Sequence, residues 1–128
     1  MNNSLENKNV NNSNIRLYSI LSYIGILWIV GILVKEKDNN IVKFHVGQGI
    51  LVSILSIIIS TISSIIGFVI GFTGAVAGVS EAFISLVSGL LGGVLGLIPL
   101  AFMIIGIINA SKYEKKELPI IGKFAFYK

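Results

Sequence analysis

A long, almost uncharged stretch constrains this chain more than any other feature. From Val46 to Ser111 the only charged residue is Glu81. The stretch is too long for one membrane helix of about 20 residues, and it fits two such helices and a turn. Over the whole chain 54% of residues are hydrophobic and 12% are charged, against roughly 25% charged in soluble domains. The sequence therefore predicts an all-α integral membrane protein whose first partner is the lipid bilayer.

The break between the two helices is predicted at residues 73–80, where small residues with little helical preference gather. Ser80 is suited to be an N-cap, and Glu81 follows in the first helical turn, where the helix dipole favours an anion. We therefore expect helices at about 48–72 and 82–110, packed as a tight hairpin.

The N-terminal region divides into a polar part and an apolar part. Residues 1–14 are rich in asparagine and have no apolar face to bury, so we expect a disordered polar tail. Residues 15–34 are apolar and too long for the core of a signal peptide. They predict a first membrane helix, and with it a single membrane domain over residues 15–128.

Basic residues set the expected orientation. The segment 35–47 and the tail 111–128 together hold eight of the ten basic residues. Cytoplasmic segments of membrane proteins are enriched in lysine and arginine. The sequence thus predicts three transmembrane helices in the cell membrane, with the N-terminus outside and a basic cytoplasmic tail. The net charge of +4 then reflects the topology of the chain in the membrane. Nucleic-acid binding is not expected, because no patch of basic and aromatic residues accompanies this charge.

Small and hydroxyl-bearing residues recur every three or four positions in the second and third predicted helices. Such stripes let helices approach closely and form hydrogen bonds in a membrane. They favour packing of the two helices or of two copies of the chain, and a weakly polar pore is the alternative. The helix-packing or pore-lining candidates are Ser53, Ser56, Ser60, Ser63, Gly67, Gly89, Gly92, Gly93 and Gly96.

No arrangement of residues predicts catalysis, a metal site or a cofactor. The chain has no cysteine and a single histidine, His45, whereas a metal site needs three or four ligands. His45 is expected to be a polar anchor at the start of the second membrane helix, and Glu81 an anion at the membrane interface. No nucleophile, base and orienting group occur together, so the chain is predicted not to be an enzyme.

Two short strings resemble a known family. Phe44-His45-Val46-Gly47-Gln48-Gly49 precedes the second predicted helix, and Glu117-Leu118-Pro119-Ile120-Ile121-Gly122-Lys123 lies in the tail. With Tyr23, they resemble small bacterial and archaeal membrane proteins related to the Tic-twenty component of the chloroplast inner-envelope import machinery. The motif residues are Phe44, His45, Gln48, Gly49, Leu118, Pro119 and Gly122. The resemblance implies an all-helical membrane fold and a part in protein transport.

These observations lead to two functional hypotheses. The first is an accessory, assembly or immunity-type membrane protein that acts through helix packing, with another copy or another membrane protein as its partner. The alternative is a pore-forming protein, either a translocation channel subunit or a holin-like protein.

Overall fold

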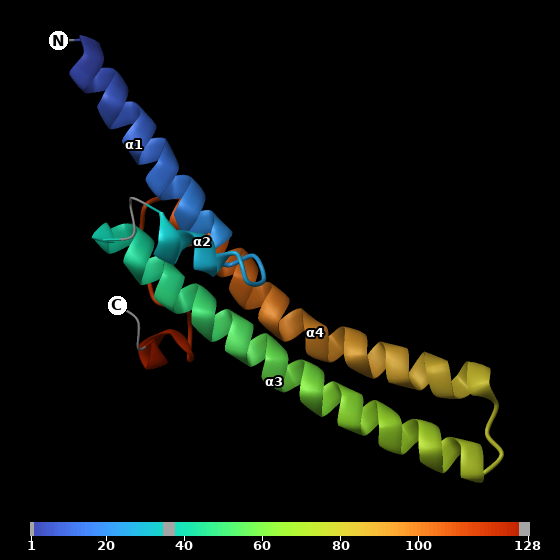
Figure 1. The fold of residues 1–128 in the computed structure, drawn as a ribbon. Helices are drawn as coiled ribbons and strands as arrows, with labels where there is room; N and C mark the ends of the chain where they lie inside the picture. The colour runs from blue at the N-terminus through green and yellow to red at the C-terminus, as the bar shows by residue number, and fades with distance from the viewer. Residues whose placement is uncertain (1, 35–37, 126–128) are drawn as a thin grey trace. The chain divides into compact units, whose positions relative to one another are not determined.

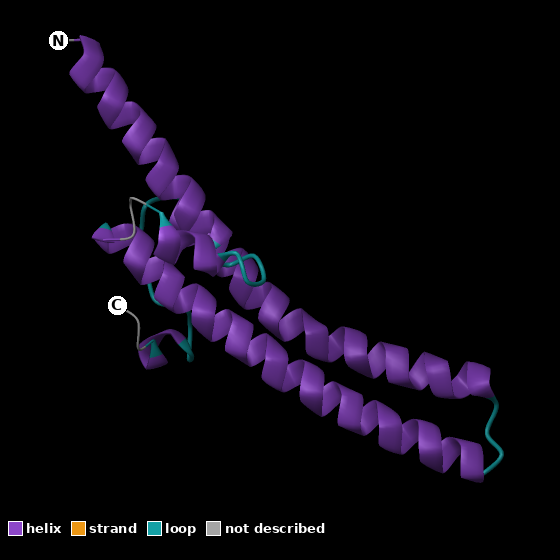
Figure 2. Cartoon of the chain, viewed as in Figure 1, coloured by secondary structure: helices purple, strands orange, loops and turns teal. Residues whose placement is uncertain are grey.

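The described residues of the computed structural model, 2–34 and 38–125, are helical with short connections (Figures 1 and 2). The helices are α1 (Asn2–Leu21), α2 (Trp28–Leu33), α3 (Asn40–Val76), α4 (Glu81–Ser111) and the 3₁₀ helix η2 (Gly122–Phe124). This agrees with the all-α prediction. Both α3 and α4 are long and apolar enough to cross a membrane.

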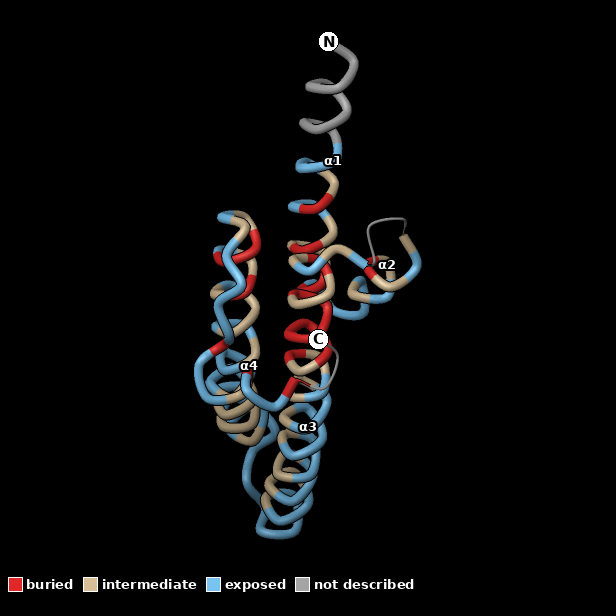
Figure 3. The backbone as a smooth tube through the Cα atoms, turned by 90° about the vertical axis from the view of Figure 1, so that its left-hand side faces the viewer, coloured by how far each residue is buried: buried red, intermediate tan, exposed pale blue. Residues whose placement is uncertain are grey.

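The chain divides into two units, and α3 and α4 each contribute to both. We call the first unit the head: it consists of the described residues up to Ser53 and those from Ala101 onward. The second, Ile54–Leu100, we call the hairpin unit. Buried residues gather in the head, whereas the hairpin unit is exposed or half-buried throughout (Figure 3). The head therefore has an interior, and the hairpin unit presents its side chains outward.

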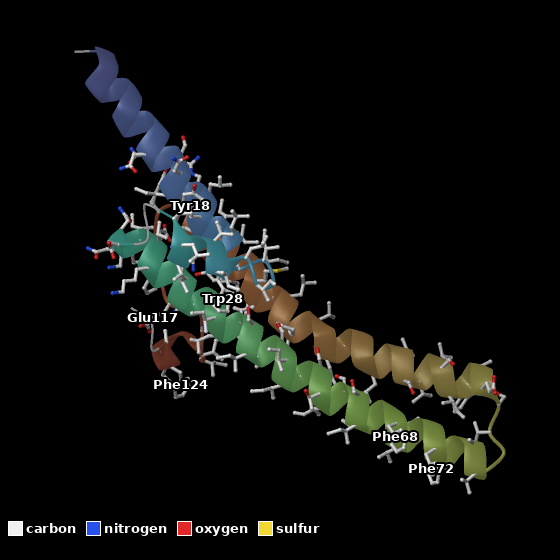
Figure 4. The ribbon with its side chains drawn as sticks, viewed as in Figure 1. Tyr18, Trp28, Phe68, Phe72, Glu117 and Phe124 are labelled. Atoms are coloured by element: carbon white, nitrogen blue, oxygen red, sulfur yellow. The ribbon has the colours of Figure 1, made fainter. Side chains whose placement is uncertain are left out.

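The hairpin unit contains the end of α3, a short loop and the start of α4. The loop is closed by the Val79 N–H, which donates to the Gly74 carbonyl over 2.9 Å, and it turns at Gly78, whose φ of +75° favours glycine. The Ser80 hydroxyl accepts from the Phe83 N–H at 3.4 Å, which confirms the predicted N-cap. Phe68, labelled in Figure 4, is 73% exposed. Exposed apolar side chains of this kind fit a lipid environment.

The helix predicted at 48–72 begins earlier in the structure, at Asn40. Its start is fixed by Asn39, whose side-chain oxygen accepts from the Ile41 N–H at 2.9 Å and lies 3.5 Å from the Val42 N. An asparagine in this position satisfies backbone donors that have no partner within the helix. The helix predicted at 82–110 corresponds closely to α4.

The apolar segment 15–34 is not one helix in the structure. It contains the end of α1, a turn and α2, and the turn includes Gly25 at a φ of +54°. Among the described residues, only α3 and α4 meet the length and hydropathy needed for a span. The third span and the orientation it implies therefore stay predictions. The single membrane domain over residues 15–128 and the disorder of residues 1–14 also stay predictions. In the structure the backbone of α1 begins at Asn2.

The interior of the head is built from two apolar clusters and a set of buried polar side chains. One cluster comprises Ile15, Val42, Val46 and Ile50, and the other Tyr23, Val52, Ala110 and Leu118. The buried polar residues are Ser19, Ser22, His45, Gln48 and Asn109. Buried polar groups lose free energy unless they are paired, so their partners determine what the head can do.

Candidate functional site

Gln48 links α3 to the segment that follows α4. Its side chain is fully buried. The Nε2 group donates to the carbonyl oxygen of Gly122 over 2.9 Å, and the Oε1 atom accepts from the N–H of Leu118 over 3.1 Å. Both halves of the carboxamide are therefore paired with backbone groups of the C-terminal segment. We call these three residues the Gln48 clip.

The backbone of the C-terminal segment is shaped for the clip. The Gly122 N–H donates to the Leu118 carbonyl at 3.0 Å, and the Ile121 N–H donates to the Pro119 carbonyl at 2.8 Å. A side chain at Gly122 would place its Cβ 2.6 Å from Gln48 Oε1. Glycine is therefore required at this position for the two segments to meet.

A second buried polar contact joins the turn after α1 to α3. The hydroxyl of Tyr23 lies 2.7 Å from Nδ1 of His45, and both side chains are buried. The His45 ring also meets the Phe44 ring edge to face, with centroids 5.2 Å apart. The Nε2 atom of His45 is buried and has no hydrogen-bond partner among the described residues. The pair provides a directional contact between the turn after α1 and α3.

Glycines mark the closest approaches in the head. A Cβ at Gly49 would collide with the backbone carbonyl of Ser22, and one at Gly106 would collide with the Tyr23 ring. Small residues allow such approaches between helices. The head therefore holds the residues just after α1 closely against both α3 and α4.

Ser53 and Trp28 form a third polar contact, which the sequence alone did not suggest. Ser53 Oγ donates to the Gly25 carbonyl over 2.7 Å and accepts from Trp28 Nε1 over 3.1 Å. Trp28 lies on α2 (Figure 4). The available signal was a tryptophan three positions after a glycine within an apolar run.

The end of α4 is tied to α1 as well. The hydroxyl of Tyr113 donates to the carbonyl of Asn12 over 2.8 Å, and the Arg16 guanidinium lies 4.8 Å from the centre of the Tyr113 ring. Cations are attracted to aromatic faces at this distance. Residues near position 12 and the end of α4 therefore lie at the same end of the head.

The structure separates the predicted stripe into two groups. Ser53 belongs to the head. The other members lie in the hairpin unit: Ser56, Ser60, Ser63, Gly67, Gly89, Gly92, Gly93 and Gly96. A Cβ built at any of those five glycines meets nothing within 4 Å. The role of these residues in packing or in lining a pore stays a prediction.

Hydroxyl groups beside the stripe are paired within their own helix. Thr61 Oγ1 donates to the Ile57 carbonyl and Ser64 Oγ to the Ser60 carbonyl, each over 2.8 Å. Such bonds need no partner helix and no water.

In the part of the chain that the structure describes, no group of three or more histidine, aspartate or glutamate residues is placed to hold a metal ion. Glu81 is exposed.

Comparison with models of protein families identifies the family of the chain. The model of the magnetosome magnetite crystal formation protein family (MamF/MmsF) matches residues 13–125. A search of the curated proteins found no match, and neither did a search of the solved structures. The resemblance to the Tic-twenty-related proteins, with the part in protein transport that it implied, is therefore wrong. The match takes in the head from residue 13 onward and both long apolar helices, so the chain is a small membrane protein that belongs to the magnetosome magnetite crystal formation protein family.

Proposed function

We propose that this protein acts in magnetite crystal formation, as a non-catalytic component of the magnetosome membrane rather than of the cell membrane. The observation that carries the proposal is the family match over residues 13–125. The match includes the Gln48 clip, the Tyr23–His45 contact and both apolar helices. The proposal therefore concerns the whole folded part of the chain and does not depend on one short motif.

The two units suggest how the work is divided. The hairpin unit offers exposed apolar side chains to the bilayer and so anchors the protein. The head has the buried interior, and it holds the C-terminal segment in one position through Gln48. Lys115 and Lys116 are exposed just before the clip. The head would thus act by contact with other components of the membrane, as an accessory or assembly protein does.

Complementation tests the proposal. The chain would be produced in a magnetite-forming bacterium that lacks its own member of this family, and crystal diameters would be measured by electron microscopy. Magnetic separation followed by carbonate extraction would show whether the chain is integral to the magnetosome membrane. We expect the chain in that fraction and crystals larger than those of the deletion strain. A chain present there with crystals unchanged would refute the proposal.

A further inference from the structure

Before α3 begins, the chain runs along one part of α3 and then turns back along it. On the inward path, α1 follows α3 in the same direction. The Ser22 carbonyl faces Gly49 on α3, and further along the Gly25 carbonyl accepts from Ser53. Increasing residue number from Ser22 to Gly25, just after α1, therefore matches increasing residue number in α3.

The return path retraces the same part of α3 in the opposite direction. Trp28 binds Ser53 through its indole N–H, and Gly31 then lies against Val46. The segment between them is α2. The chain therefore passes from the level of Val46 to the level of Ser53 and back before α3 begins.

The turn reaches only part of the way into a bilayer. Lys43 is the last charged residue before the uncharged stretch of α3, so the membrane interface lies at the level of Lys43 or further along the helix. Ser53 is ten positions further along the helix, which corresponds to about 15 Å at 1.5 Å per residue. The hydrocarbon core is about 30 Å thick. The turn at Gly25 thus lies no deeper than about half of the core and does not reach the opposite side.

The outer surface of this segment suits acyl chains. No charged residue lies between Arg16 and Lys35. Ile26 is 70% exposed and Leu33 77% exposed, and Ile24, Leu27 and Ile29 are exposed as well. An irregular backbone within a membrane needs its polar groups paired. The Gly25 carbonyl meets that need through Ser53.

We propose that residues 22–33 form a re-entrant segment, which enters the acyl-chain region of the bilayer and leaves it on the side where it entered. Its partner is lipid, continuous with the lipid around α3 and α4. The proposal places residues 11–16 on the same side as the C-terminal segment. The three-helix prediction places them on opposite sides, so labelling distinguishes the two.

The chain has no cysteine, so single cysteines can report side directly. The full chain would be produced as Asn11→Cys, Lys116→Cys, Val79→Cys and Ile26→Cys, all at exposed positions. Each would be treated with a membrane-impermeant maleimide in spheroplasts and in inside-out vesicles. Val79 reports the loop of the hairpin unit, and Lys116 reports the C-terminal side.

We expect positions 11 and 116 to react from one side and position 79 from the other. Position 26 should react at least tenfold more slowly than position 11 in both preparations, because lipid covers it. Reaction of position 11 from the same side as position 79 would overturn the proposal and establish a crossing. Fast reaction at position 26 would also overturn it, because the segment would then be in water.

Discussion

The side-chain amide of Gln48 donates a hydrogen bond to the carbonyl oxygen of Gly122, 2.9 Å away, although 74 positions separate the two residues. The same side chain accepts from Leu118. One buried carboxamide thus fixes the position of the whole segment after α4. The clip therefore joins distant parts of the chain through two hydrogen bonds of one side chain.

Replacement of Gln48 by leucine should release the C-terminal segment. The variant leaves the buried Leu118 N–H without its partner, which costs about 1–3 kcal/mol. The Gly122 carbonyl loses the bond from Gln48 and keeps the one from the Ala125 N–H. Hydrogen exchange followed by mass spectrometry in detergent should show faster exchange over residues 118–122. Ser64→Ala is the control, because its hydroxyl bonds only to its own helix. Equal protection in both variants would show that Gln48 does not hold the segment.

The contact between Tyr23 and His45 should contribute to stability as a pair. Tyr23→Phe removes the hydroxyl and leaves Nδ1 of His45 buried without its partner, at a cost of about 1–3 kcal/mol. His45→Leu removes the other half. Unfolding free energies of the two single variants and the double variant form a cycle. We expect a coupling energy well above about 0.5 kcal/mol, and additive effects would contradict the contact.

Glycine positions should divide sharply into two classes. Gly106→Ala forces a Cβ into the Tyr23 ring, and overpacking of this kind costs about 1–3 kcal/mol. Gly93→Ala, on the same helix, meets open space. Thermal unfolding in detergent should therefore show a lower midpoint for Gly106→Ala alone. If copies pair through the stripe, Gly93→Ala will instead weaken a dimer, which chemical crosslinking would detect.

Production of the chain in a bacterium should leave the membrane potential intact. Beside the serine stripe, Thr61 and Ser64 direct their hydroxyls to carbonyl groups of α3 itself, so they offer little to a water-filled path. A potential-sensitive dye, read together with growth and with membrane-inserted protein level, measures the effect. Prompt collapse of the potential at modest production would support the pore hypothesis over the proposal made above.

The two long helices were predictable because charge is the dominant signal in a membrane. The lone Glu81 between Val46 and Ser111 left little choice but two apolar helices, and Ser80 indicated where the second begins. The segment 15–34 was harder to interpret, since its length shows only that it could cross a bilayer. The positive φ at Gly25 and the close approach of Gly31 to Val46 divide it, and both depend on tertiary contacts.

The clip was out of reach for a similar reason. The strings around Gln48 and Leu118 stood out in the sequence. However, nothing in either string shows that the Gln48 side chain contacts the backbone of the C-terminal segment. The structure indicates that these residues form a packing device, with a carboxamide, two backbone groups and a glycine. A packing device is compatible with many functions. This explains why the strings suggested a family that the comparison then replaced.

That the head carries the function in magnetite crystal formation is tested most directly by crystal size in matched variants. The wild-type chain, Gln48→Leu and Ser64→Ala would each replace the family member of a magnetite-forming bacterium, and electron microscopy would measure crystal diameters. The three chains are compared only when they are present in equal amounts in the purified magnetosome membrane. The account predicts full-sized crystals with the wild-type chain and Ser64→Ala, and small crystals with Gln48→Leu. Full-sized crystals with Gln48→Leu would contradict it.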